Sequence, residues 1–469
     1  ETAPGLVLQS IGGGGVLAGS APISVTAGSQ GFGSSSAGPI ELINRGAITT
    51  VGANSTAVIL QSIGGGGVYT TSAGGGVITL GGSVVGDNDA GAISLRSSGA
   101  ITTTDSNAAA IVAQSIGGGG GSVFGLESAV ASSIRLGSDT ATQNRGSAIE
   151  LTITGPLTSY GDLSPGVIAQ SIGGGGGYAP LAATSASAGA SNSVGLSAAA
   201  VSINLSADLT TTGNFSDAVI AQSIGGGGGV LGSTTTSLTL GATNGGQGQA
   251  DDIAVVSSAT IRTRGEQSVG ITAQSIGAGG GRAGSASGSV TLGAAGGSGN
   301  AGNVSLNLAG ANGDGSIITT GSQSPAFVLQ SIGGGGGLVF PDSGNGNGDL
   351  LLGGSGLGSE GSGGGVSFTA GNSSRVVTTG DGSSGLTYQS IGGGGGYAGS
   401  TTASAQLGGT YRGTSRGADL TLSSQVAVST VGSDASAMAV QSIGGGGGFV
   451  GSIGQNVTLG GTAALAGES

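Results

Sequence analysis

Apolar residues occur along this chain in short runs separated by glycine, serine, threonine and asparagine. One such stretch places the run Leu209–Thr211 before a glycine at Gly213 and a second run at Ala218–Ile224. Short alternating runs bounded by turn-forming residues are typical of β-strands, and no stretch follows the period of an amphipathic helix. The pattern therefore predicts an all-β protein with negligible helix.

The strand pattern is copied along the chain, and each copy contains Gln-Ser-Ile followed by a run of glycines. Neighbouring copies are 52 to 59 residues apart, and a period of this size indicates one structural unit that is repeated and stacked. The glutamines are Gln9, Gln61, Gln114, Gln170, Gln222, Gln274, Gln330, Gln389 and Gln441. The isoleucines are Ile11, Ile63, Ile116, Ile172, Ile224, Ile276, Ile332, Ile391 and Ile443.

Four strand-like patches recur in each period, which predicts a repetitive parallel β-helix, or β-solenoid. Equivalent strands would stack about 4.8 Å apart, so that like residues form columns and the aliphatic columns form the core. The thirteen residues before each glutamine contain no insertion in any complete copy, and we expect them to superpose. Since 52 residues is long for one coil of such a helix, we interpret each repeat as about two coils. Residues 1–469 are then one continuous solenoid of about nine repeats that begins and ends mid-repeat.

The glycine runs and the glutamine column each have two interpretations. Five glycines recur almost strictly, whereas a flexible linker would mix in serine and vary in length. We therefore expect a role in backbone geometry, either positive φ or a close backbone approach. The glutamines form either an internal amide ladder or an outward polar row. We favour the internal ladder, because stacked amides satisfy one another.

Composition removes several classes of function. The chain has ten Lys plus Arg, 22 Asp plus Glu and a net charge of −12, so we expect no nucleic acid partner. No apolar run is long enough for a transmembrane helix. With no histidine and no cysteine, Ser-His-Asp triads, thiol chemistry and histidine metal sites are impossible.

Few residues suggest chemistry, and we expect neither an enzyme nor a cofactor. The acidic pairs Asp251 with Asp252 and Asp87 with Asp89 fit solvated turns better than paired catalytic carboxylates. The stretch Asp342–Asp349 resembles a calcium loop but offers two aspartates in one copy, so calcium remains a minor alternative. A threonine column eleven residues before the glutamines raises an ice-binding alternative, although its triplets are irregular.

Strings such as Ile220–Gly229, preceded by Thr211–Ser216, resemble the passenger regions of large bacterial autotransporter-like proteins. The resemblance covers essentially the whole chain. It implies a Gram-negative exported protein with a β-helical passenger that is displayed on the cell surface or released from it. Such proteins usually carry a C-terminal outer-membrane barrel, and we expect no membrane barrel in this segment, because its end lacks aromatic girdles.

These features lead to three function hypotheses. The first is a structural stalk or fibre at the cell surface or outside the cell, in adhesion, biofilm matrix or a surface coat. Its partner would be itself, stacked end to end or laterally through glycine faces, and a host or matrix surface is a second candidate. The alternative is an adhesin that binds a ligand or carbohydrate through variable loops, foremost the long loop 341–365. A β-helix carbohydrate-active enzyme is the third.

Overall fold

A computed structural model gives the fold of the chain, and the part of the chain that it describes contains 51 strands and no helix. The expected all-β solenoid is therefore confirmed. The structure describes all residues except 1–2, 22–24, 29, 33, 73–75, 126–130, 139–142, 181–182, 191–193, 233, 242–246, 285–287, 294–297, 311–312, 341–347, 355–360, 402–403, 412–414, 453, 461 and 464–469.

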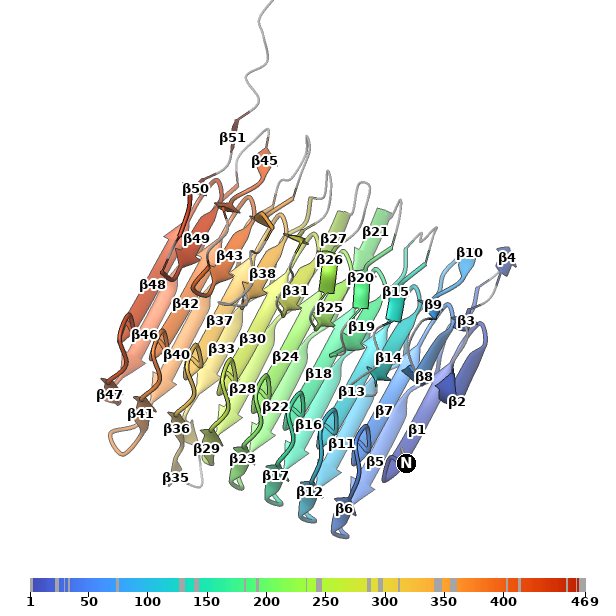
Figure 1. Cartoon of the computed structure of the whole chain (residues 1–469), viewed down its shortest axis with the longest axis horizontal. Coiled ribbons are helices and arrows are strands. Elements are labelled where there is room, and N and C mark those ends of the chain that lie inside the picture. Colours follow the sequence, from blue (N-terminus) through green and yellow to red (C-terminus); the bar gives the residue numbers. More distant parts are fainter. Residues whose placement is uncertain are drawn as a thin grey trace, which may run out of the picture.

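Five long parallel sheets run the length of the molecule, and each coil contributes one strand to each sheet (Figure 1). The strands with the Gln-Ser-Ile motif form the nine-stranded Gln sheet: β1 (Leu6–Ile11), β7 (Val58–Ile63), β13 (Ile111–Ile116), β18 (Val167–Ile172), β24 (Val219–Ile224), β30 (Ile271–Ile276), β37 (Phe327–Ile332), β42 (Leu386–Ile391) and β48 (Met438–Ile443).

The next two sheets in chain order also have nine strands each. The Gly sheet begins in the glycine runs: β2 (Gly15–Ala21), β8 (Gly67–Ser72), β14 (Gly120–Gly125), β19 (Gly176–Ala179), β25 (Gly228–Leu231), β31 (Gly280–Ala283), β38 (Gly336–Val339), β43 (Gly395–Ala398) and β49 (Gly447–Val450). The Leu-Gly sheet follows: β3 (Val25–Ala27), β9 (Val77–Leu80), β15 (Ala131–Leu136), β20 (Ala183–Ala188), β26 (Thr234–Leu240), β32 (Ser289–Leu292), β39 (Leu350–Leu352), β44 (Ala405–Leu407) and β50 (Val457–Leu459).

Two eight-stranded sheets complete each coil before it returns to the Gln sheet. The Glu sheet consists of β5 (Ile40–Asn44), β11 (Ile93–Ser97), β16 (Ile149–Ile153), β22 (Val201–Leu205), β28 (Ile253–Ser257), β33 (Val304–Asn307), β40 (Val366–Ala370) and β46 (Leu420–Ser424). The Thr sheet consists of β6 (Ile48–Thr50), β12 (Ile101–Thr103), β17 (Leu157–Ser159), β23 (Leu209–Thr211), β29 (Thr260–Thr263), β36 (Ser316–Thr319), β41 (Arg375–Thr378) and β47 (Ala427–Thr430).

Short pairs of strands lie in the connections between these sheets. They are β4 (Gln30–Phe32) with β10 (Ser83–Val85), β21 (Val194–Ser197) with β27 (Gln247–Gln249), β34 (Ala309–Gly310) with β35 (Gly313–Asp314), and β45 (Thr410–Tyr411) with β51 (Thr462–Ala463).

Like residues stack on like residues in consecutive repeats. In the Gln sheet Gln9 pairs with Gln61, and Gln61 pairs with Gln114. The Thr sheet keeps the same register, with Ile48 beside Ile101 and Ile101 beside Leu157. The expectation that the residues before each glutamine superpose is confirmed by this pairing.

One repeat makes one coil, so the interpretation of each repeat as about two coils is wrong. Gln9 and Gln61 are 52 residues apart and lie on neighbouring strands. The reason for the large coil is that its path does not follow a simple ring. Strands of the Gln and Gly sheets, such as β18 and β19, are buried along their whole length, which means that they run through the interior of the coil.

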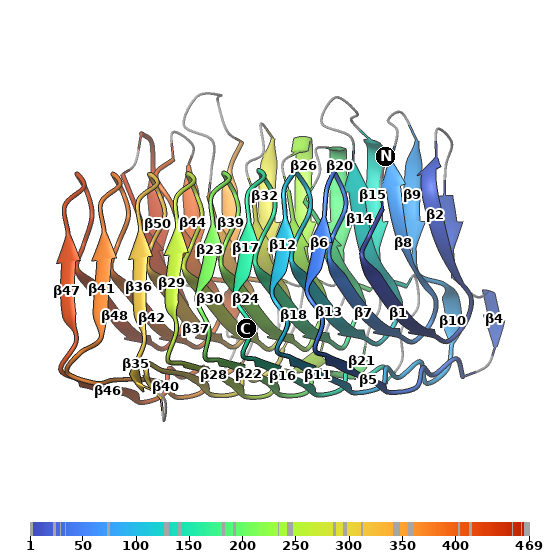
Figure 2. The ribbon, with the colours of Figure 1, turned by 90° about the horizontal axis from the view of Figure 1, so that it is seen from below.

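The layers of the coil can be followed through the side chains of β18. Val167 and Ala169 pack in one cluster with Ile149 of the Glu sheet and Leu157 of the Thr sheet. Ile168, which points the other way, packs with Tyr178 of the Gly sheet. The following residue of the Gly sheet, Ala179, belongs to a further cluster shared with the Leu-Gly sheet. The Gln and Gly sheets therefore lie between the outer sheets; Figure 2 shows the Thr strands in front and the Glu strands along the bottom.

Candidate functional site

The glutamine column is the most regular polar feature of the interior. In each of the eight steps, Nε2 of one glutamine donates to Oε1 of the glutamine in the next coil, at 2.7 or 2.8 Å. Every glutamine from Gln61 to Gln389 is fully buried. The column is thus an internal amide ladder, as the sequence analysis favoured.

From Gln61 onward the side-chain amide also donates to a second acceptor. Nε2 of Gln170 donates to the carbonyl of Gly177 in its own coil at 3.3 Å, and the later copies repeat this bond at 3.2 or 3.3 Å. Gln61 belongs to a copy with four glycines, and it donates instead to the Ser122 hydroxyl at 3.2 Å. A buried amide without partners would be destabilising, so these bonds explain why the interior tolerates a polar column.

The serine and isoleucine of the motif have separate roles. Ser115 donates through Oγ to the carbonyl of Gly91 at 2.9 Å and accepts from the amide of Ser147 at 2.8 Å, which fixes the loops that lead into the Glu sheet. The isoleucines from Ile63 to Ile391 are fully buried and form a cluster of their own, each stacked on its copies. All three residues of the motif therefore bind one coil to its neighbours.

The glycine runs have the geometric role that the sequence predicted. Gly176 and Gly177 have φ of 148° and 144°, a region that side chains rarely adopt. A Cβ on Gly176 would lie 1.8 Å from the carbonyl oxygen of Gly228, and one on Gly177 would lie 1.9 Å from that of Gly121. The strands carrying these glycines are buried, so the expected lateral assembly through glycine faces is wrong.

One buried ion pair interrupts the neutral interior. The Arg282 guanidinium lies 2.8 Å from an oxygen of Asp217, and both side chains are almost completely buried. Asp217 also accepts from the amide of Val269 at 2.9 Å, and Arg282 donates to the carbonyl of Gln267 at 2.9 Å. Burial raises the pKa of Asp217 above its usual range, while Arg282 opposes that rise. Sequence reasoning missed this pair, because 65 residues separate its members.

The acidic pairs of the sequence lie in loops, where Asp87, Asp251 and Asp252 are exposed and Asp89 is partly buried. Asp252 accepts from the amide of Asn303 at 2.7 Å, and the amide of Asp251 donates to Ser223 at 2.9 Å. Asp89 accepts from the amide of Arg145 at 2.9 Å, and partial burial raises the pKa of Asp89. The bonds of Asp252 and Asp89 connect successive coils, whereas the bond of Asp251 to Ser223 lies within one coil.

No group of His, Cys, Asp or Glu in the described part of the chain could hold a metal ion. The calcium-like stretch 342–349 lies outside the described residues apart from its end, as does most of the loop 341–365. In the part of the chain that the structure describes, no helix is long and apolar enough to cross a membrane. The threonine column that raised ice binding is buried at Thr103, Thr211 and Thr263, so it offers no flat outer surface.

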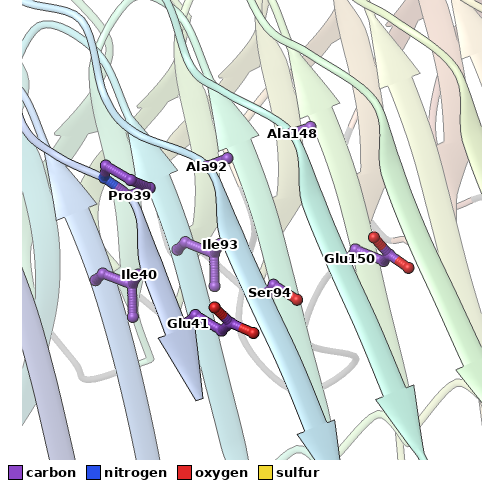
Figure 3. Close-up of a pocket in the computed structure, with 8 residues that line it drawn as sticks. All are labelled: Pro39, Ile40, Glu41, Ala92, Ile93, Ser94, Ala148 and Glu150. Atoms are coloured by element: carbon purple, nitrogen blue, oxygen red, sulfur yellow. The ribbon is translucent and has the colours of Figure 1, made fainter. Parts of the chain in front are cut away.

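The outer face of the Glu sheet carries two shallow grooves. The first, of about 500 Å³, is lined by Pro39, Ile40, Glu41, Ala92, Ile93, Ser94, Ala148 and Glu150 (Figure 3). The second, of about 280 Å³, includes Arg45 and Arg96. Carboxylates and guanidinium groups thus share one face of β5, β11 and β16. The same outward column is neutral in the next coils, at Ser202, Ala254 and Ser305.

No protein-family model, curated protein or solved structure matches this chain.

Proposed function

We propose that this chain is a structural rod, exported to the bacterial surface or beyond it, that serves as a stalk or fibre in adhesion, biofilm matrix or a surface coat. The observation that carries the proposal is the amide ladder. Each of its interior glutamines is completely buried and bonded to its own copies. The most regular polar groups of the chain are therefore used to stack coils, and a stacked, stiff body is what a stalk requires.

The export route rests on the resemblance of the Gln-Ser-Ile-glycine repeats to autotransporter-like passengers. We further propose that the rod associates with copies of itself, and that a host or matrix surface is its second partner. Exposed turns of serine, threonine and glycine along the coils would supply that contact, since loops on a rigid scaffold are where binding usually lies.

Shortening the rod in register tests the structural role. Removing residues 330–440 joins Leu329 to Gln441 and deletes two whole repeats without touching the grooves of the Glu sheet. If the chain acts as a stalk, adhesion or biofilm formation by cells that display the shortened protein falls, although the protein folds and reaches the surface. Unchanged adhesion at equal display would contradict a stalk.

The grooves of the Glu sheet favour a second candidate, an adhesin that binds a carbohydrate or another small polar ligand. Their charged residues lie on β5, β11 and β16 or directly after β5, whereas the ladder extends through all coils. Replacing Glu41 and Glu150 by glutamine would then abolish adhesion, and replacing the exposed Glu266, which lies outside the grooves, would leave it intact. Equal adhesion of both variants would exclude this candidate.

A further inference from the structure

The charged side chains on the outer face of the Glu sheet are arranged by sign. Residues at paired positions of neighbouring strands form columns, and Glu41, Ser94 and Glu150 form one outward column across β5, β11 and β16. Arg96 lies in the next outward column, two residues along β11 from Ser94. Arg45 follows β5 and lines the same groove as Arg96. Carboxylates and guanidinium groups therefore occupy separate columns of one face.

These four charged side chains are exposed and have no ionic partner among the described residues of their own chain. The ion pairs within the described part of the chain are those of Arg262 and Arg282. In Figure 3 the carboxylates of Glu41 and Glu150 stand on either side of Ser94, where they border the groove of about 500 Å³. A groove with a carboxylate on each side is suited to a guanidinium group.

We infer that two copies of the chain pair side by side through their Glu sheets, with the two rods parallel. This inference rests on the self-association proposed above and names the face that carries it. A two-fold axis along the rod, midway between the two outward columns, places each column over the other column of the second copy. Arg96 then lies over Ser94 of the second copy, and its guanidinium enters the groove between Glu41 and Glu150 of that copy. The same contact forms in both directions, as a two-fold interface requires.

The charges also set the orientation of the rods. If the rods ran antiparallel with β11 over β11, Glu41 would lie over Glu150 of the second copy, and Arg96 would lie over Arg96. Like charges placed opposite each other are destabilising. In parallel rods each Arg96 instead lies one strand spacing, about 4.8 Å along the column, from the level of each carboxylate. Electrostatic complementarity therefore favours the parallel pair.

The rest of the face allows close approach but adds little attraction. Beyond β16 the outward residues are uncharged, beginning with Ser202, Asn204 and Ala254. The strands from β5 to β28, which precede the hairpin of β34 and β35, cover about 400 Å² of each copy. A contact of about this area is weak and reversible, so the ionic pairs decide whether the rods associate. We therefore expect association to weaken about tenfold or more between about 0.01 M and 1 M salt, because the screening length falls from about 30 Å to about 3 Å.

Charge reversal in the whole chain tests the pairing in sedimentation experiments at low salt. Glu41→Arg with Glu150→Arg leaves only basic groups in the patch, and Arg45→Glu with Arg96→Glu leaves only acidic ones. Each double variant alone should stay monomeric, because its patch repels its own copy. A one-to-one mixture of the two should form dimers, and a chain with all four reversals should dimerise like the parent.

The control variant is Glu266→Arg with Asp349→Arg, which reverses two exposed carboxylates outside the Glu sheet and should dimerise like the parent. A parent chain that is monomeric at low salt, or that dimerises equally well in 1 M salt, would overturn the pairing. A mixture and a four-fold reversal that both stay monomeric would overturn it as well, and would leave the groove to the ligand of the second candidate. The stalk proposal is judged separately by its deletion test.

A spin label tests the orientation of the rods. The chain has no cysteine, so Thr421→Cys on β46 provides one exposed attachment site. In the Glu sheet β46 lies six strands from β11, or about 29 Å. In parallel rods the two labels of a dimer lie at one level and within about 25 Å, because facing sheets are about 10 Å apart. A distance near about 58 Å in pulsed electron spin resonance, as antiparallel rods centred on β11 would give, would overturn the parallel arrangement.

Discussion

The Gln and Gly sheets and the outer face of the Glu sheet follow opposite rules along the same coils. In the interior the Gln-Ser-Ile motif is identical in all nine copies, and its glutamines and isoleucines contact their own copies. On the outer face the column that begins with Glu41 and reaches Glu150 becomes neutral further along the chain.

The difference has a simple physical cause. An interior side chain of a one-coil repeat touches the same residue in the coil before and in the coil after it, so a change at one level disturbs two interfaces. An outward side chain faces water and has fewer constraints. The identical Gln-Ser-Ile motif inside and the varied column outside therefore separate the part of the molecule that stacks the coils from the part that is free to bind.

The glycine runs should be the most sensitive interior positions. In Gly228→Ala the new Cβ would lie 1.9 Å from the carbonyl oxygen of Gly280, and the backbone φ of 141° is unfavourable as well. We expect a loss of more than about 4 kcal/mol in the free energy of unfolding, measured by denaturant titration. Gly46→Ala is the control, because no atom lies within 4 Å of its Cβ position. A chain with Gly225–Gly229 all replaced by alanine that melts like the parent would refute the geometric role.

Substitutions in the buried ion pair test whether this polar contact is needed for the stability of the fold. Asp217→Val leaves the Arg282 charge buried without its partner, and we expect a loss of about 3–5 kcal/mol. Adding Arg282→Val, which copies Val230 of the preceding coil, should restore stability to the parent level or above it. Thermal unfolding of the single and double variants measures both effects. A double variant as unstable as the single one would mean that the packing of the Arg282 side chain, and not its ion pair with Asp217, stabilises this part of the interior.

The free energy of unfolding that is lost when a ladder glutamine is replaced should depend on the position of that glutamine in the column. Gln222→Leu removes the acceptor of one Nε2 hydrogen of Gln170, which keeps its bond to Gly177, and removes the donor to Oε1 of Gln274. Each buried polar group that loses its partner costs about 1–3 kcal/mol. Gln9→Leu in the first coil removes only the donor to Oε1 of Gln61, and the resulting loss of unfolding free energy should be clearly smaller. Equal losses at both positions would argue against a ladder bonded on both sides.

The smallest effect is expected on the outer face. Glu150 lies on an exposed position of β16, and Glu150→Gln should change the free energy of unfolding by less than about 0.5 kcal/mol. Denaturant midpoints of parent and variant decide this. A loss comparable to that of Gln222→Leu would remove the contrast between the interior and the outer face.

Much of the fold could be predicted because the spacing of the repeats gives the register in which their strands pair. Identical residues at a fixed spacing stack, so the glutamine, isoleucine and aliphatic columns could be identified without coordinates. The sequence only favoured glutamines that point inward. The strand residues on the same face as each glutamine and those on the opposite face are both apolar, so the pattern did not show which face was buried. Burial of Gln114 and its neighbours on both faces of the Gln sheet explains that ambiguity.

Other features left no signal in the sequence. The number of coils per repeat was predicted wrongly, because periodicity gives the length of a repeat and not the path it takes through the interior. Seven residues before the glutamines, Leu163 and Phe215 have φ of 54° and 53°, a left-handed conformation that neither residue type favours. In the same turns Thr211 donates to the carbonyl of Ser216 at 2.6 Å, and such contacts hold the backbone where the local sequence would not.

Cryo-electron microscopy of the purified chain tests the central claim most directly, because that claim is one coil per repeat around a continuous amide ladder. The map should show nine levels with the glutamines in the interior and successive levels about 4.8 Å apart along the axis. Glutamines about 9.6 Å apart along the axis, with an intervening level that lacks them, or glutamines on the outer surface, would contradict it.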